Sequence, residues 1–200
     1  AERLMSWYPL FVDDPTAPII PQKDELFKAA VDDEDLLKTK KLIEDIGRSV
    51  NSKDPFGAPL ACSVNSFEIL SYLLKHKDFN KEIDCGGGNT PLHIRAANDN
   101  PSLSQLLIDN GFNVNQQNDD GNTPLHVLLK YSLRPDLITP YRSHQNLDRI
   151  DNFIKTAKLL IDSGTDLERR NTQGEKPLDP LKEHAETVEK SAPALFTYIK

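Results

Sequence analysis

Histidine and carboxylate side chains could carry chemistry in this chain, but their spacing matches no catalytic motif. Five histidines occur, at positions 76, 93, 126, 144 and 184, and none belongs to an H-E-x-x-H pair. Neither a G-x-S-x-G nucleophile turn nor a C-x-x-C pair is present. Neighbouring carboxylates such as Asp119 and Asp120 are predicted to lie in turn tips. We therefore expect no enzymatic activity, no metal site and no cofactor.

Two cysteines, Cys62 and Cys85, are too few for a disulfide scaffold and lack the clustered partners of a zinc site. We expect Cys62 to pack in a helix, because no electropositive partner that would activate its thiol can be identified. Cys85 precedes three glycines. No strand comes before this run and no Lys-Ser/Thr pair follows it, so it does not match a phosphate-binding loop. The run is therefore predicted to be a flexible turn. Low cysteine content favours a reducing compartment, and thus a cytoplasmic location.

Composition excludes two further classes of function. The chain has 200 residues, of which 38% are hydrophobic and 28% charged, as expected for a water-facing domain. Its net charge is -7, whereas a generic nucleic-acid binder would be basic. No run of about 18 apolar residues exists, so we expect no transmembrane helix.

Internal repeats organise the chain. GNTPLH occurs at positions 88–93 and again at 121–126, so Pro91 and Pro124 are separated by a period of 33. Weaker copies surround Pro59, close to one period before Pro91, and Pro177, well beyond one period after Pro124. A second signature, L-L-I-D-x-G, occurs at positions 106–111 and 159–164, and each copy ends at the same distance before the next of these prolines. The extra length between Pro124 and Pro177 therefore forms an insertion at about 133–152.

The order T-P-L-H, then L-L-x-x-G, then V-N, with a period of 33, resembles the ankyrin repeat family over about residues 23–180. The resemblance implies an all-α fold, an ankyrin-repeat solenoid of stacked helix-turn-helix units with β-turn fingers between them. We place the units at about 23–53, 54–84, 85–118, 119–170 and 171–200. Residues 1–22 form an N-terminal extension. An apolar pattern at 187–199 predicts a closing helix.

The TPLH residues have physical reasons for their positions. A threonine hydroxyl at position 90 or 123 can cap the first helix. The proline that follows stands at the first helical position, where an N–H would have no partner inside the helix. The resemblance implies that His93 and His126 bond to backbone groups of neighbouring turns. Arg95 and Leu128 depart from the pattern, because ankyrin units usually carry a small alanine there.

The resemblance also implies where a partner would bind. Stacking leaves a concave face whose fingers and first helices have side chains that the core does not need. These candidate partner-binding positions are Phe56, Gly57, Gly87, Asn89, Asn98, Asp99, Asp120, Asn122, Lys130, Tyr131, Gln173 and Glu175. They are mostly polar and acidic, with Phe56 and Tyr131 as aromatic anchors. A partner protein with a basic, partly apolar surface would complement them.

Two segments outside the repeat pattern leave alternatives open. The insertion contains Tyr141, Arg142 and His144, residue types common at binding anchors. It is either a further part of the partner site or a solvated loop, with Leu147–Asn152 extending the second helix backwards. The extension at 1–22 carries Trp7 and Phe11 and either covers the first repeat or docks a partner.

The sequence thus predicts a monomeric, non-enzymatic module that binds another protein, and neither nucleic acid nor a membrane interior. An alternative is a regulatory or targeting domain of a longer enzyme chain. Degenerate ankyrin arrays with insertions are also similar to effector proteins that intracellular pathogens deliver into host cells, which implies a host protein as partner and the host cytoplasm as location.

Overall fold

The computed structural model describes residues 25–54, 57–132 and 144–183. Every named element of secondary structure in this part is a helix. Its strand-like pairing is limited to an isolated bridge between Lys53 and Pro59. These helices confirm the all-α class predicted from the sequence.

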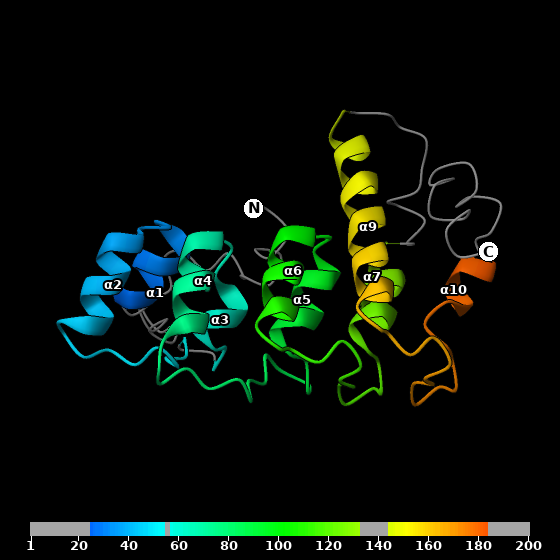
Figure 1. Cartoon of the computed structure of the whole chain (residues 1–200), viewed down its shortest axis with the longest axis horizontal. Helices are drawn as coiled ribbons and strands as arrows, with labels where there is room; N and C mark the ends of the chain where they lie inside the picture. Colours follow the sequence, from blue (N-terminus) through cyan, green and yellow to red (C-terminus); the bar gives the residue numbers. More distant parts are fainter. Residues whose placement is uncertain (1–24, 55–56, 133–143, 184–200) are drawn as a thin grey trace, which may run out of the picture.

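The helices follow one another in short pairs, which Figure 1 shows side by side in a row. The loops that join successive pairs gather along one edge of this row (Figure 1). In chain order the helices are α1 (Glu25–Phe27), the π-helical turn η1 (Lys28–Asp32), α2 (Leu36–Glu44), α3 (Leu60–Ser63), α4 (Phe67–Lys75), α5 (Pro91–Ala97), α6 (Pro101–Asp109), α7 (Pro124–Ser132), α9 (His144–Asp162) and α10 (Asp179–Glu183).

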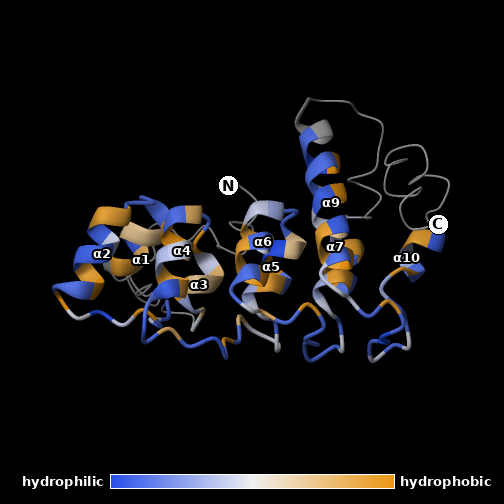
Figure 2. Cartoon of the chain, viewed as in Figure 1, coloured by the Kyte–Doolittle hydropathy of each residue, from blue (hydrophilic) through white to orange (hydrophobic). Residues whose placement is uncertain are grey.

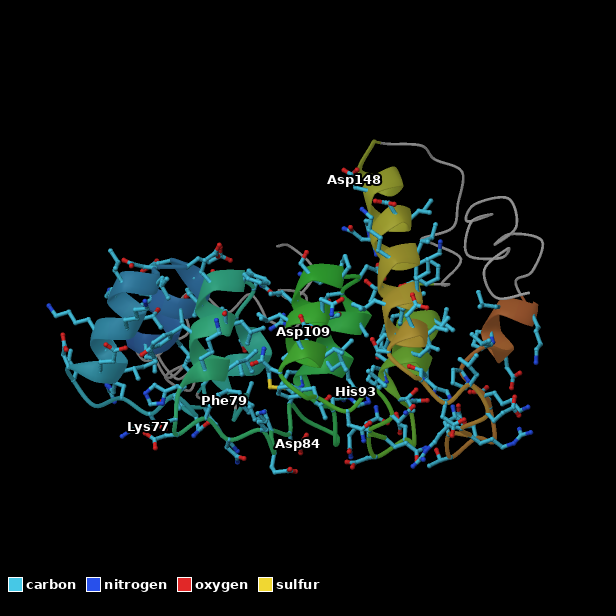
Figure 3. The ribbon with its side chains drawn as sticks, viewed as in Figure 1. Lys77, Phe79, Asp84, His93, Asp109 and Asp148 are labelled. Carbon is cyan, nitrogen blue, oxygen red and sulfur yellow. A yellow bond between two sulfur atoms is a disulfide. The ribbon has the colours of Figure 1, made fainter. Side chains whose placement is uncertain are left out.

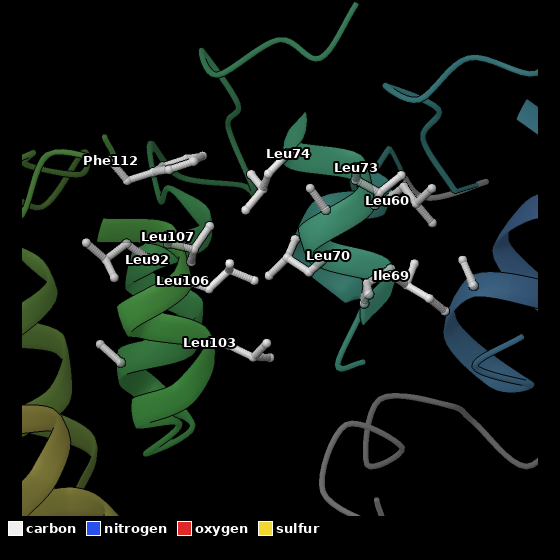
Figure 4. Close-up of a cluster of buried hydrophobic side chains, with 14 of the residues drawn as sticks. Leu60, Ile69, Leu70, Leu73, Leu74, Leu92, Leu103, Leu106, Leu107 and Phe112 are labelled. Carbon is white, nitrogen blue, oxygen red and sulfur yellow. The ribbon is translucent and has the colours of Figure 1, made fainter. Parts of the chain in front are cut away.

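Leucines at helical spacing build the core between neighbouring pairs. Hydrophobic residues lie on the helices and hydrophilic residues predominate along the loops (Figure 2). Leu70 of α4 and Leu106 of α6 point toward one another across the junction between two pairs, and both are buried (Figure 4). Each fully buried leucine contributes about 1.5–3 kcal/mol relative to an exposed one. The core is therefore a continuous line of junctions, as stacking of repeats requires.

Polar caps fix where the second helices begin. The Lys38 N–H donates to the Asp35 carboxylate at 2.9 Å, at the start of α2. The Leu103 N–H donates to the Asn100 side-chain oxygen at 3.0 Å, at the start of α6. Each cap satisfies a helix N–H that has no partner inside the helix. Pro101 then stands where a missing N–H costs nothing.

Helix α9 is the exception to the short pairs. It has 19 residues, whereas α6 has nine, and at about 1.5 Å per residue it is roughly 15 Å longer. Figure 1 shows it extending past its neighbours on the side away from the loops. Its first part, residues 144–152, belongs to the predicted insertion, so this part extends the second helix backwards, from His144 rather than Leu147.

Three predictions concern segments outside the described residues: the N-terminal extension at 1–22, the remaining insertion at 133–143 and the closing helix at 187–199. Within the described residues, no helix is both long enough and apolar enough to cross a membrane.

Candidate functional site

In the part of the chain that the structure describes, the fingers are four turns closed by the same backbone hydrogen bond. In the third finger (residues 85–90) the Cys85 N–H donates to the Asn89 carbonyl at 2.7 Å. In the fourth (118–123) the Asn118 N–H donates to the Asn122 carbonyl at 3.0 Å. The second finger (54–59) and the fifth (171–176) close with the same bond, so helices α3, α5, α7 and α10 each follow a turn closed in one way.

Each TPLH motif joins the start of a first helix to the next finger. The Thr90 N–H donates to His93 Nδ1 at 3.1 Å, and the Thr90 hydroxyl lies 2.9 Å from the same nitrogen. His93 Nε2 lies 2.9 Å from the Asn122 carbonyl. Because that carbonyl can only accept, Nε2 carries the proton and donates, while Nδ1 accepts. His93 is thus a neutral bridge between fingers, as the resemblance implies.

The second motif repeats this arrangement. The Thr123 N–H donates to His126 Nδ1 at 3.1 Å, and His126 Nε2 donates to the Glu175 carbonyl at 3.1 Å. Burial lowers the pKa of His93 and of His126 below the usual 6.5, although the hydrogen bonds to backbone carbonyls act in the opposite direction. Both rings are therefore structural, and neither is placed to exchange a proton with a substrate.

Further bonds tie the third, fourth and fifth fingers into one row. The Asp119 N–H donates to the Gly87 carbonyl at 3.0 Å, and the Thr172 N–H donates to the Asp120 carbonyl at 3.0 Å. Close approach is possible because Gly88 has no side chain, since a Cβ there would lie 2.5 Å from the Asp119 carboxylate. The three fingers are thus joined to one another by hydrogen bonds between their backbones.

Side-chain amides strengthen the same row. The Asn118 amide donates to the Asn89 side-chain oxygen at 2.8 Å, and the Asn171 amide donates to the Asn122 side-chain oxygen at 3.0 Å. Asn89 and Asn122 therefore hold the fingers together. Asn122 is 4% exposed, so its side chain is not open to a partner, contrary to our expectation.

Most of the other predicted partner-binding residues lie at the surface. Asn98 follows the end of α5 and Tyr131 lies near the end of α7, one repeat period later, so they occupy the same place in neighbouring units. The Tyr131 residue is 42% exposed. Exposed positions among the predicted set are Gly57, Gly87, Asn98, Asp120, Lys130, Tyr131, Gln173 and Glu175.

Of the remaining predicted positions, one is buried, one lies on α9 and three fall outside the described residues. Asp99 is 6% exposed, so it is buried rather than open to a partner. Phe56, Tyr141 and Arg142 lie outside the described residues. His144 is the first residue of α9, in the part of that helix that extends away from the fingers (Figure 1).

Asp99 instead joins the inserted part of α9 to the preceding unit. Its backbone has φ 50°, a left-handed conformation that aspartate tolerates better than most residues. The Ser132 hydroxyl donates to its carboxylate at 2.5 Å, and the Arg149 guanidinium of α9 lies 3.6 Å away. Burial raises the pKa of Asp99, although the Ser132 hydrogen bond and the Arg149 charge oppose this rise.

The two cysteines are bonded to one another, which was not predicted from the sequence. Cys62 in α3 and Cys85 in the third finger form a disulfide, with Cα atoms 5.7 Å apart and a sequence separation of 23. The finger is consequently tied to the preceding unit and is not the flexible turn that its glycines predicted. Sequence reasoning missed the bond because the two positions meet only when neighbouring units stack.

Arg95 is a second feature that the sequence did not reveal. Its side chain is buried, and one guanidinium nitrogen donates to the Cys62 and Val64 carbonyls at 2.9 and 2.6 Å. The other terminal nitrogen donates to the Asn65 side-chain oxygen at 2.8 Å. Helix α3 has only four residues, so its carbonyls need partners from outside the helix, and Arg95 supplies them.

Metal binding and proton transfer have little support among the described residues. No group of three or more His, Cys, Asp or Glu side chains in this part is placed to hold a metal ion. Figure 3 shows Asp84 and His93 near the finger edge and Asp148 near the opposite end of α9, so these titratable groups do not converge.

The repeats match a known protein family. The family model for ankyrin repeats, in three copies, matches residues 26–118 and 59–137. Together these matches span residues 26–137, which is more than half of the 200-residue chain. Among curated proteins, no match is found. The chain belongs to the ankyrin repeat family.

Proposed function

We propose that this chain binds another protein on the surface formed by the third to fifth fingers and the first helices α5 and α7. Ankyrin repeats are generally protein–protein interaction modules, and such domains are typically not enzymes. The observation that carries the proposal is the row of fingers bonded to one another while their tips stay exposed. A surface already ordered in the free protein loses little conformational entropy on binding.

Charge and aromatic character define the partner that this surface suits. Asp120 and Glu175 are exposed at the fourth and fifth fingers, and they would attract a basic surface from a distance. Tyr131 supplies a large side chain that is partly apolar. The proposed partner is therefore a protein with a basic surface and an apolar depression that receives Tyr131.

Site-specific photocrosslinking tests this assignment. A photoreactive phenylalanine analogue replaces Tyr131 in one variant and Phe67 in a matched control. Phe67 is also aromatic and exposed, at 47%, but it begins the second helix α4 rather than lying on a first helix. We expect one protein from cell lysate to crosslink from position 131 and not from position 67.

The captured protein is then purified and tested again at lower ionic strength. A partner recruited by the acidic fingers should crosslink more efficiently as salt is reduced. Equal crosslinking from both positions, or crosslinking from position 67 alone, would contradict the proposed surface.

The finer predictions from the sequence belong to this proposal and stand on the sequence alone. They are the role as a pathogen effector acting on a host protein, the cytoplasmic location and the monomeric state. The alternative of a regulatory or targeting domain in a longer enzyme chain has no specific observation in its favour among the described residues.

A further inference from the structure

An asparagine bridges the loops of neighbouring units at two junctions, with the same pair of bonds each time. The Asn51 amide donates to the Asp78 carbonyl at 2.7 Å, and its side-chain oxygen accepts from the Asn80 N–H at 2.9 Å. At a later junction the Asn115 amide donates to the Gly164 carbonyl at 2.9 Å, and its side-chain oxygen accepts from the Asp166 N–H at 2.7 Å. In both places a primary carboxamide joins a carbonyl to the N–H of the next residue but one.

The junction between these two lacks the bridge. Glu82 lies one repeat period before Asn115 and therefore occupies its position, while Gly111 and Asn113 lie one period after Asp78 and Asn80. A carboxylate has no N–H to donate to the Gly111 carbonyl. Within the described residues, neither the Gly111 carbonyl nor the Asn113 N–H has a hydrogen-bond partner, and the Glu82 side chain forms no bond either.

A groove of about 360 Å³ opens at this same junction, between the loop that follows α4 and the loop that follows α6. Ile83 and Phe112 supply apolar lining, while the backbone around Gly111 and Asn113 forms part of its wall. Lys81 stands where the Asn115 loop has the buried Val114, and its ammonium turns to the Asn110 carbonyl at 2.8 Å. The groove thus coincides with two departures from the repeat, at positions 81 and 82.

We propose that this groove binds a primary carboxamide, presented by an asparagine or glutamine side chain of a polypeptide partner. The amide nitrogen donates to the Gly111 carbonyl and the amide oxygen accepts from the Asn113 N–H. This is the bond pair that Asn51 makes within the chain, supplied here by another molecule. The aliphatic part of the side chain packs on Ile83 and Phe112.

The groove also selects against close analogues of this side chain. An acidic side chain has no donor for the Gly111 carbonyl, and the carboxylates of Glu82 and Asp84 repel it. An apolar side chain of the same shape leaves both backbone groups unpaired. Gly88 and Thr90 of the third finger also line the groove, but the groups that hold the carboxamide, at Gly111 and Asn113, lie outside the proposed surface of fingers and first helices. The test therefore does not depend on that surface or on an identified partner.

Nuclear magnetic resonance of the 15N-labelled protein measures binding of N-acetylglutamine N-methylamide, with the glutamate and methionine counterparts as controls. We expect a saturable shift of the Asn113 amide proton, and of the Phe112 nitrogen that reports the Gly111 carbonyl. The glutamate and methionine probes should bind about fivefold more weakly or worse. Acetamide, which lacks the aliphatic stem, should also need a higher concentration than the glutamine probe.

Two variants at one position separate filling of the site from loss of the charge. Glu82→Asn supplies the internal bridge, so the Asn113 signal should already be shifted, the probe response should vanish and the midpoint of thermal unfolding should rise. Glu82→Ala removes the carboxylate without filling the site, so it should retain the response to the glutamine probe.

Three results would overturn the proposal. They are equal responses to the glutamine and methionine probes, an unshifted Asn113 signal at saturating glutamine probe, and a Glu82→Asn protein that responds to the probe like the natural one. If acetamide binds as tightly as the glutamine probe, the polypeptide origin of the carboxamide is refuted.

Discussion

At the scale of single residues, Arg95 shows how one side chain can compensate for a short helix. Helix α3 stops after four residues, and Arg95 of the next unit donates to the carbonyls at its end. Burial lowers the pKa of Arg95 to about 10, which still leaves the side chain charged at neutral pH. The charge is tolerated because it is placed among carbonyl dipoles.

Arg95→Ala, which restores the residue usual in the family, should therefore destabilise this protein. We expect the free energy of unfolding to fall by about 2–4 kcal/mol, because buried carbonyls lose their donors and a cavity remains. Urea denaturation followed by circular dichroism measures the change. Leu128→Ala at the equivalent position in the next unit is a control for lost volume alone. A neutral or stabilising Arg95→Ala would refute the role assigned to the guanidinium.

The buried histidines predict how stability depends on pH. Because burial lowers the pKa of His93 and His126, the unfolded chain binds protons near pH 6.5 that the folded chain does not. Their contribution is therefore complete above pH 6.5 and is lost progressively as the pH falls below that value. Thermal unfolding at pH 7.5 and 5.5 measures the loss.

The double variant His93→Gln/His126→Gln isolates this contribution, because glutamine does not titrate in this range. The difference in melting temperature between pH 7.5 and 5.5 should become smaller in the variant. An unchanged difference would show that other groups cause the pH dependence.

The roles of the TPLH residues could be predicted from the sequence because their spacing repeats. The role of Arg95 could not, since it depends on where α3 ends and on which carbonyls then lack partners. Burial of Asp99 was likewise hidden, because Arg149 reaches it from a helix that comes much later in the chain.

At the scale of elements, the disulfide fixes the third finger to helix α3. The sequence separation of 23 between Cys62 and Cys85 means that the bond restricts the unfolded chain appreciably. Disulfides persist in oxidising compartments, so the low cysteine count carries little weight as an argument for a reducing one.

Reduction with dithiothreitol should lower the free energy of unfolding by about 3 kcal/mol, through the freedom returned to the unfolded chain. Urea denaturation with and without the reductant measures this difference. Cys62→Ser/Cys85→Ser should have the stability of the reduced protein and should not respond to dithiothreitol. If the natural protein also fails to respond, the bond does not contribute in solution.

Helix α9 could be predicted only in part from the sequence. The extra length was visible in the long interval between Pro124 and Pro177, and the helical alternative named for residues 147–152 agrees with the structure. The start at His144 was not visible, because a polar segment has no apolar stripe that would distinguish helix from loop.

At the scale of the whole molecule, stacking places the fingers along one edge (Figure 1), and Gly87, Asp120 and Gln173 at their tips are exposed. The repeat period was sufficient to predict this arrangement, because each unit contacts only its neighbours. The groove beside Glu82 was not predicted, since the two loops that line it meet only when neighbouring units stack. Departures from a repeat are thus visible in the sequence, but their consequences require the stacked structure.

The central claim is that the fingers and first helices carry the binding of a partner protein. The most direct test is the affinity of the crosslinked partner for Tyr131→Ala and for the control Phe67→Ala, measured by isothermal titration calorimetry. We predict that Tyr131→Ala weakens binding by about 2 kcal/mol, close to 30-fold, while Phe67→Ala leaves it unchanged. Unchanged affinity in the folded Tyr131→Ala protein, with a loss in Phe67→Ala, would place the partner on the second helices and contradict the account.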